Sequence, residues 1–132
     1  MNEHLIRLRG GWESRPAISS ESEQQRLILP VRGGLRDPRQ VILTRRFGRP
    51  RVQPGSRVLL RMDQVQGIVA LLLNGKSIFP VSPEITRYEI ELPTLAERNV
   101  LVLEIELREP AGEITGAGVE WGMIALVVRT GD

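Results

Sequence analysis

The chain has 132 residues, with 18 lysine and arginine side chains against 16 aspartate and glutamate, one histidine and no cysteine. This length can bury a core without covalent staples, and the lack of cysteine excludes disulfides and thiolate metal sites. The longest apolar run, 68–73, is far shorter than the ~20 residues of a membrane helix. Residues 1–9 lack the apolar region of a signal peptide, so we expect a cytoplasmic protein.

Apolar and polar residues alternate along short segments that are separated by glycine, proline and polar residues, which predicts β-strands joined by turns. We expect strands within 5–9, 26–31, 41–47, 57–62, 68–73, 87–92, 100–107 and 119–129. Surface loops are expected at 14–25 and 32–40, and one short helical turn at 93–98.

The segment 68–73 is apolar at every position and is followed directly by Asn74-Gly75. Asn-Gly favours a two-residue hairpin turn, because both residues tolerate the positive φ that such a turn needs. We therefore expect 68–73 to form a central strand with both faces covered, and the chain to continue through a hairpin.

About eight short strands without an amphipathic helix are the pattern of an all-β, antiparallel β-sandwich of jelly-roll type. No internal repeat or linker divides the sequence, so we expect a single domain over residues 1–132.

A series of short motifs runs along the chain from Val41 onward. In order they are Arg46-Phe47, Val58-Leu59-Leu60-Arg61-Met62, Leu72-Leu73-Asn74-Gly75-Lys76, Tyr88-Glu89-Ile90, Asn99-Val100-Leu101-Val102-Leu103 and Gly122-Met123-Ile124-Ala125-Leu126-Val127. Together they resemble the sugar-binding jelly-roll domain of family 2 glycoside hydrolases, within the galactose-binding-like β-sandwich group. The resemblance covers about two thirds of the chain and implies the fold, with carbohydrate as the ligand class.

The side chains that carry hydrolytic chemistry are sparse. The only histidine, His4, lies near the N-terminus, and a nucleophilic triad would need it fixed by an acid. Glu89 with Glu91, and Glu104 with Glu106, alternate with isoleucine as a solvated sheet face requires, which we favour over a glycosidase carboxylate pair. We expect no enzyme activity, no cofactor and no metal, although backbone carbonyls of the loop 109–120 could form a calcium site.

Positive charge is concentrated in one part of the chain. Nine arginines against one aspartate fall between residues 32 and 61: Arg32, Arg36, Arg39, Arg45, Arg46, Arg49, Arg51, Arg57 and Arg61. Such a segment could bind a polyanion. However, Phe47 is the only aromatic residue there that could stack on a base, so we do not expect nucleic acid as a partner. The arginines could equally pair with neighbouring strands or with another subunit.

Aromatic residues decide how a carbohydrate would be held, because sugar rings stack on exposed indole or phenol rings. Trp12 and Trp121 lie at predicted strand ends, and with Arg46 and Glu120 they form the predicted ligand-binding site. The alternative, which we favour for the two tryptophans, is that both cap the core. Tyr88 and Phe79 are most simply core residues.

The sequence therefore predicts a non-catalytic binding module, with carbohydrate or glycan as its ligand. The alternative function is a structural or assembly protein whose copies associate through sheet faces or the arginine-rich surface. Apolar residues on the faces opposite the core, namely Leu59, Val100 and Val102, would suit such a subunit interface. We expect no contact with a membrane.

Overall fold

The computed structural model describes residues 2–16, 24–32, 40–106 and 120–130. The strands in these ranges are β1 Asn2–Arg7, β2 Trp12–Pro16, β3 Gln25–Leu27, β4 Val31–Arg32, β5 Gln40–Gly48, β6 Arg57–Asp63, β7 Ile68–Leu73, β8 Lys76–Ser77, β9 Arg87–Glu91, β10 Arg98–Glu106, β11 Glu120–Trp121 and β12 Met123–Thr130. No helix in this part of the chain is long and apolar enough to span a membrane.

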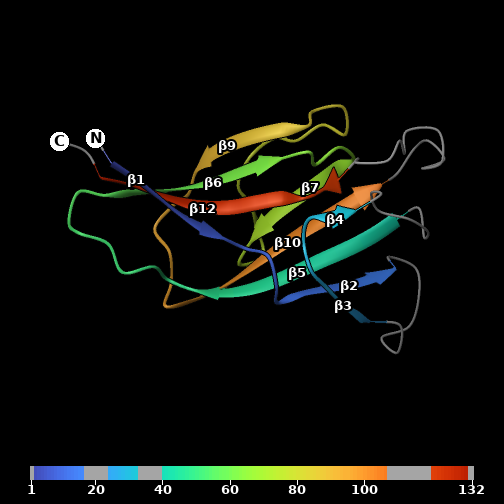
Figure 1. Ribbon diagram of the computed structural model, residues 1–132, viewed down its shortest axis with the longest axis horizontal. Helices are drawn as coiled ribbons and strands as arrows, with labels where there is room; N and C mark the ends of the chain where they lie inside the picture. Colours follow the sequence, from blue (N-terminus) through green and yellow to red (C-terminus); the bar gives the residue numbers. More distant parts are fainter. Residues whose placement is uncertain (1, 17–23, 33–39, 107–119, 131–132) are drawn as a thin grey trace.

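The strands form two main antiparallel sheets that face one another (Figure 1). Sheet A has the order β1-β12-β6-β9, and sheet B has the order β3-β2-β5-β10-β7-β8. A small third sheet pairs β11 with β4. The predicted all-β sandwich is confirmed, and the described strands before residue 40 complete it, because β1 extends sheet A while β2 and β3 extend sheet B.

The core lies between the inner faces of the sheets, as alternation along the strands requires. On sheet B, Leu103 of β10 lies opposite Leu43 of β5 and Leu71 of β7, and all three are buried. Sheet A contributes Leu60, Met62, Ile90 and Leu126 to the same cluster.

The centre of sheet B is occupied by β5 and β10, and not by β7 as the sequence led us to expect. β7 lies beside the two-residue edge strand β8, and its outward residues Ala70 and Leu72 are only half-buried. The prediction that both faces of 68–73 are covered was therefore wrong. A β-bulge interrupts the strand at its start: Ile68 pairs with Ile105 and Ala70 with Glu104, so Val69 between them has no partner on β10.

A glycine with positive φ lies at each end of β7, Gly75 in the turn to β8 and Gly67 just before the strand. Asn74 and Gly75 have φ values of 53° and 83°, so the predicted turn with positive φ at both residues is confirmed. At the other end of β7, Gly67 has a φ of 93°, and a Cβ atom there would lie 2.9 Å from the carbonyl oxygen of Glu106. Gly67 also accepts a hydrogen bond from the Glu106 amide, so any side chain would disturb the start of this strand pair.

Other local predictions need correction. Residues 14–16 continue β2 where a loop was expected; the rest of that loop (17–23) and most of the next (33–39) lie outside the described residues. The segment 93–98 forms no helical turn. Leu59 was expected on an exposed face, but it is only 6% exposed.

Candidate binding site at one end of the sandwich

The two tryptophans of the predicted site are core residues. Trp12 is 0% exposed and Trp121 is 1% exposed. The indole Nε1 of Trp12 donates a hydrogen bond to the Leu8 carbonyl at 2.8 Å, and that of Trp121 donates to the Gln66 carbonyl at 2.9 Å. Neither ring is open to a ligand, so the predicted tryptophan platform is not formed, and the alternative that both residues belong to the core is correct.

One short segment nevertheless joins the two tryptophans. Trp12 pairs with Leu27 at the end of β3, and Trp121 pairs with Val31 in β4. Between them Leu29 is buried, and its side chain packs so closely on Gly122 that a Cβ atom there would meet it at 3.0 Å. The tryptophans therefore anchor the connection that runs from sheet B to β11.

The other two predicted site residues lie on different elements. Arg46 is exposed on the outer face of β5, and its guanidinium is 3.7 Å from the Glu13 carboxylate. Glu120 is half-buried at the start of β11. Their part in ligand binding stays a prediction. Of the two aromatic residues expected in the core, Tyr88 is buried, whereas Phe79 is 40% exposed and packs edge-on against the Tyr88 ring.

The described arginines between residues 32 and 61 do not form one positive stripe. Arg46 projects outward from sheet B, whereas Arg57 and Arg61 belong to the outer face of sheet A and pair with Glu91 and Glu89. Arg45 points toward the inner side and donates to the Arg46 carbonyl. Arg36 and Arg39 lie outside the described residues.

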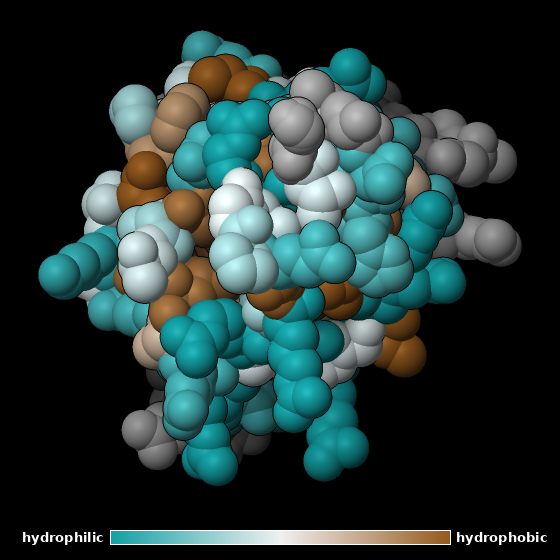
Figure 2. Space-filling model, turned by 90° about the vertical axis from the view of Figure 1, so that its left-hand side faces the viewer, coloured by the Kyte–Doolittle hydropathy of each residue, from teal (hydrophilic) through white to brown (hydrophobic). Residues whose placement is uncertain are grey.

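Arg49 and Arg51 are arranged differently, because they line a hollow of about 510 Å³ with Pro50, Val52 and Glu97. The hollow lies where the β5–β6 and β9–β10 connections meet, at the end of the sandwich on the left of Figure 1. Figure 2 shows that end as a mainly hydrophilic surface interrupted by apolar patches. Among the described residues neither Arg49 nor Arg51 has a carboxylate within ion-pair distance, so both guanidiniums can receive an anion.

Backbone contacts hold the two walls of the hollow together. The Arg49 amide donates to the Glu97 carbonyl at 3.0 Å, and the Arg49 guanidinium donates to the Leu95 carbonyl at 3.3 Å. Leu95 is buried, which fixes the β9–β10 connection on the core. Arg51 is exposed, and among the described residues its side chain makes no comparable hydrogen bond.

A buried asparagine, Asn99, holds together the chain segments that form the two walls of the hollow. Asn99 is 1% exposed; its side-chain amide donates to the carbonyls of Ala96 (2.9 Å) and Phe47 (3.5 Å). Its side-chain oxygen accepts hydrogen bonds from the Ala96 amide and from the Asn74 side chain, each at 3.0 Å. Asn99 thus joins β5, the β7–β8 turn and the β9–β10 connection. The Asn-Gly and Asn-x-Leu motifs of the sequence are in contact here, because the side chains of Asn74 and Asn99 are hydrogen-bonded to each other.

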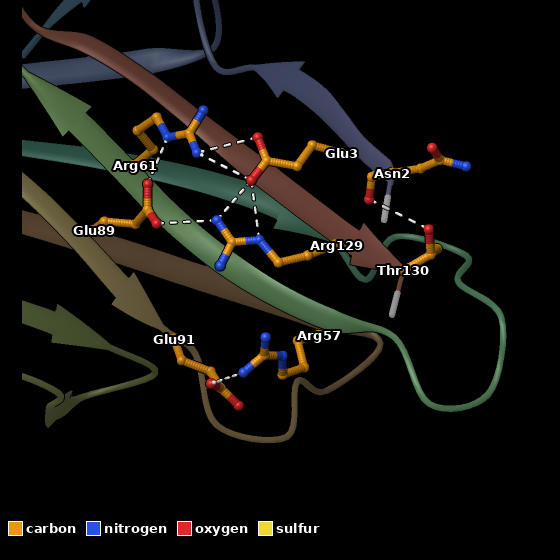
Figure 3. A network of polar contacts seen from close by, with 8 residues as sticks. All are labelled: Asn2, Glu3, Arg57, Arg61, Glu89, Glu91, Arg129 and Thr130. Carbon is orange, nitrogen blue, oxygen red and sulfur yellow. Dashed lines mark hydrogen bonds and ion pairs between the residues drawn. The ribbon is translucent and has the colours of Figure 1, made fainter. Parts of the chain in front are cut away.

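The outer face of sheet A carries a network of opposite charges (Figure 3). Arg129 donates to Glu3 at 2.6 Å and to Glu89 at 3.1 Å, and Arg61 bonds the same two carboxylates at 3.3 Å and 2.8 Å. The four side chains lie across β6 and β12. Leu59, Ala125 and Val127 on this face are buried, which we attribute to cover by the aliphatic stems of the arginines.

These contacts make stability depend on pH. Hydrogen bonds from Arg129 and Arg61 hold the pKa of Glu3 below its usual range, and hydrogen bonds from Arg61 and Arg129 do the same for the pKa of Glu89. The unfolded chain then binds protons more readily than the folded one. The network's contribution is therefore full above the unfolded pKa of about 4.3 and is lost as the pH falls through the lower folded values.

We expect urea unfolding, measured between about pH 6 and about pH 3, to show this loss of stability. Glu89→Gln should flatten the dependence, and added salt should weaken it because the pairs are exposed. Glu104→Gln on sheet B is the matched control and should leave the slope unchanged. Equal slopes for the wild type and Glu89→Gln would contradict the assignment.

Within the described residues no group of three histidine, aspartate or glutamate side chains could hold a metal ion. The loop on which a calcium site was considered falls largely in 107–119, outside the described residues. Glu89 and Glu91 lie on the sheet A surface as expected for a solvated face, and Glu104 and Glu106 are partly exposed on the outer face of sheet B.

Comparisons with known proteins give a fold relationship. No protein-family model and no curated protein matches the sequence. A β-glucuronidase from an uncultured Clostridium sp. matches 97% of this chain with a TM-score of 0.69 and 15% identity, over 29% of its own length. Bifidobacterium dentium β-glucuronidase, solved with coumarin-3-O-glucuronide, matches 98% with a TM-score of 0.69 and 16% identity, over 30% of its length. A putative β-galactosidase from Bacteroides fragilis matches 98% with a TM-score of 0.63 and 15% identity, over 24% of its length.

The chain is thus an all-β sandwich of the kind found as a part of glycoside hydrolases, and the fold resemblance expected from the sequence motifs is confirmed. It spans between 24% and 30% of the length of these three solved structures. At such low identities the likeness is one of fold, and the matched region is a minor part of each enzyme.

Proposed function

We propose that this chain is a non-catalytic module that binds an acidic carbohydrate in the hollow between the β5–β6 and β9–β10 connections. The observation that carries the proposal is the pair Arg49 and Arg51, which face a 510 Å³ hollow and have no carboxylate partner among the described residues. Ligand sites typically enclose about 300–1,000 Å³, so a monosaccharide unit fits the space.

The chemistry of the hollow favours a sugar that bears a carboxylate. Guanidinium groups bind carboxylates with two parallel hydrogen bonds, which gives both charge and geometric selection. Glu97 on the opposite wall can accept hydrogen bonds from sugar hydroxyls. One structural neighbour was solved with a glucuronide, a sugar acid of this class. Because no aromatic ring lines the hollow, we expect affinity in the millimolar range, about −4 kcal/mol.

The test is a titration of the full chain with glucuronate, followed by NMR chemical shifts or calorimetry, with glucose as the neutral comparison. We expect saturable binding of glucuronate and at least about tenfold weaker binding of glucose, since one charged hydrogen-bonded pair contributes about 1.5–3 kcal/mol. Arg51→Gln should weaken glucuronate binding to a similar extent, because it removes one of the two guanidiniums that would hold the carboxylate. Among the described residues Arg51 forms no ion pair, so we expect the fold to stay intact.

Two control variants locate the site. Arg57→Gln removes an exposed arginine that pairs with Glu91 on sheet A, and it should leave binding unchanged. Arg46→Gln tests the site predicted from the sequence; a loss of binding in this variant alone would move the site to the outer face of β5. Equal affinity of glucose and glucuronate, or unchanged binding by Arg51→Gln, would contradict the proposal.

A further inference from the structure

Both outer faces of the sandwich carry apolar residues, but the arrangement differs. On sheet A, Leu59 and Val127 are buried, whereas Leu5 of the edge strand β1 and Met123 at the start of β12 are 42% and 40% exposed. On sheet B the outward apolar side chains of the central strands stay partly exposed. They are Ile42, Ala70, Leu72, Val100 and Val102. A contiguous strip of this kind on a sheet face is typical of an interaction surface.

The register of sheet B places these residues in rows. One row crosses all six strands and consists of Arg26, Glu13, Thr44, Val102, Leu72 and Ser77. The next row consists of Arg15, Ile42, Glu104 and Ala70. The apolar strip is therefore centred on Val100 and Val102 of β10 and Ala70 and Leu72 of β7, with Ile42 of β5 diagonal to Val102 and Glu104 between Ile42 and Ala70.

The charges on this face are partly separated by sign. Arg15, Arg26 and Arg46 belong to β2, β3 and β5, whereas Glu104 and Glu106 belong to β10. Glu13 is the acidic exception on the basic side and lies 3.7 Å from Arg46, and Arg98 at the start of β10 is the basic exception on the acidic strand. No ion pair within the described residues neutralises Arg15 or Glu104, in contrast to the paired charges of sheet A.

We propose that the outer face of sheet B binds a second copy of the same chain, with its basic strands over the acidic strand of its partner. A two-fold axis along the strands, between β5 and β10, stacks the two faces and keeps each row at its own level. Thr44 of each copy then meets Val102 of the other. β2 of one copy lies over β7 of the other, so Arg15 stands over Ala70, one strand away from Glu104, which its long side chain can reach.

The size of the face sets the expected strength of the dimer. Six strands about 4.8 Å apart make it roughly 25 Å wide, and the seven residues from Gln40 to Arg46 extend it by about 20 Å. The buried area is then roughly 500 Å² per copy, or about 1,000 Å² in total, which is near the lower limit for a specific interface. The dimer should therefore dissociate at micromolar concentrations.

The test measures the mass of the full chain by light scattering and sedimentation equilibrium between about 1 μM and about 1 mM, the range in which such an interface associates. We expect a concentration-dependent dimer. Arg15→Glu and Glu104→Arg should each weaken association at least about tenfold by opposing like charges. The double variant Arg15→Glu/Glu104→Arg exchanges the two charges and should recover most of the wild-type affinity.

Val102→Asp places a charge in the apolar strip and should leave only monomer, whereas Arg57→Gln on sheet A should have no effect on mass. Circular dichroism and tryptophan emission establish that each variant is folded. A wild type that is monomeric over the whole range overturns the proposal and leaves this face to a different polypeptide. So does a dimer that Val102→Asp does not affect, or a double variant that associates no better than the single ones.

Discussion

Replacing Trp121 by alanine is expected to lower the free energy of unfolding by about 3–5 kcal/mol, the largest effect of a single substitution that we predict for this chain. Trp121 is 1% exposed and packs in the core beside the segment that joins β3 to β4. Alanine would leave a cavity that the surrounding strands can fill only in part. It would also leave the Gln66 carbonyl without the hydrogen bond from the indole.

Urea unfolding followed by circular dichroism measures this loss. Trp121→Phe is the matched control, because it keeps an aromatic ring and should lose distinctly less stability. The wild type should show blue-shifted tryptophan emission that glucuronate does not change, since neither indole meets the ligand. A loss below about 1 kcal/mol for the alanine variant, or a saturable change of emission with sugar, would contradict the core assignment.

Asn99→Ala is expected to cost about 2–4 kcal/mol, because a buried group left without its partner costs about 1–3 kcal/mol and Asn99 serves several. The substitution leaves the Ala96 amide without an acceptor and the Ala96 and Phe47 carbonyls without a donor. It also releases the β9–β10 connection that forms one wall of the hollow. Glucuronate binding should therefore weaken together with stability.

Thermal and urea unfolding of Asn99→Ala are best compared with Asn74→Gly. That variant removes the hydrogen bond from Asn74 to Asn99 and the one that Asn74 accepts from the Val100 amide, but it keeps the positive φ of the turn. Because the Asn74 side chain is at the surface, we expect a loss of about 1 kcal/mol. If both variants were equally stable, Asn99 would not organise this end of the sandwich.

Local sequence patterns were enough to predict the strands, but not which residues on the outer faces of the sheets are buried. Alternation placed Tyr88, Ile90 and Leu92 correctly inside, and Asn-Gly predicted its turn, because these signals depend on neighbours in the sequence. Leu59 is buried on the outer face beside Val127 and Glu91 of the neighbouring strands, which are remote from it along the chain. No pattern within β6 contains that information.

The candidate site was predicted less well. Trp12 and Trp121 stand beside glycine and glutamate at strand ends, which left a sugar platform open although the core was favoured; strand register and the segment 27–31 decide for the core. Arg49 and Arg51 were recognised only as part of a basic stretch. The hollow between them and Glu97 arises from two connections that are brought together by Asn99, and its one sequence signal was the motif that begins at this asparagine.

The pairing of β1 with β12 has a consequence for the order of folding. Asn2 lies opposite Thr130, and β12 is also the strand that joins β1 to β6 in sheet A. On the ribosome, β6 and β9 can pair early, but this sheet cannot form until the residues of β12 have been synthesised. Until then Leu60, Met62 and Ile90 lack their cover, and contacts of such long range form slowly. The nascent chain is therefore expected to depend on chaperones until its last strand is in place.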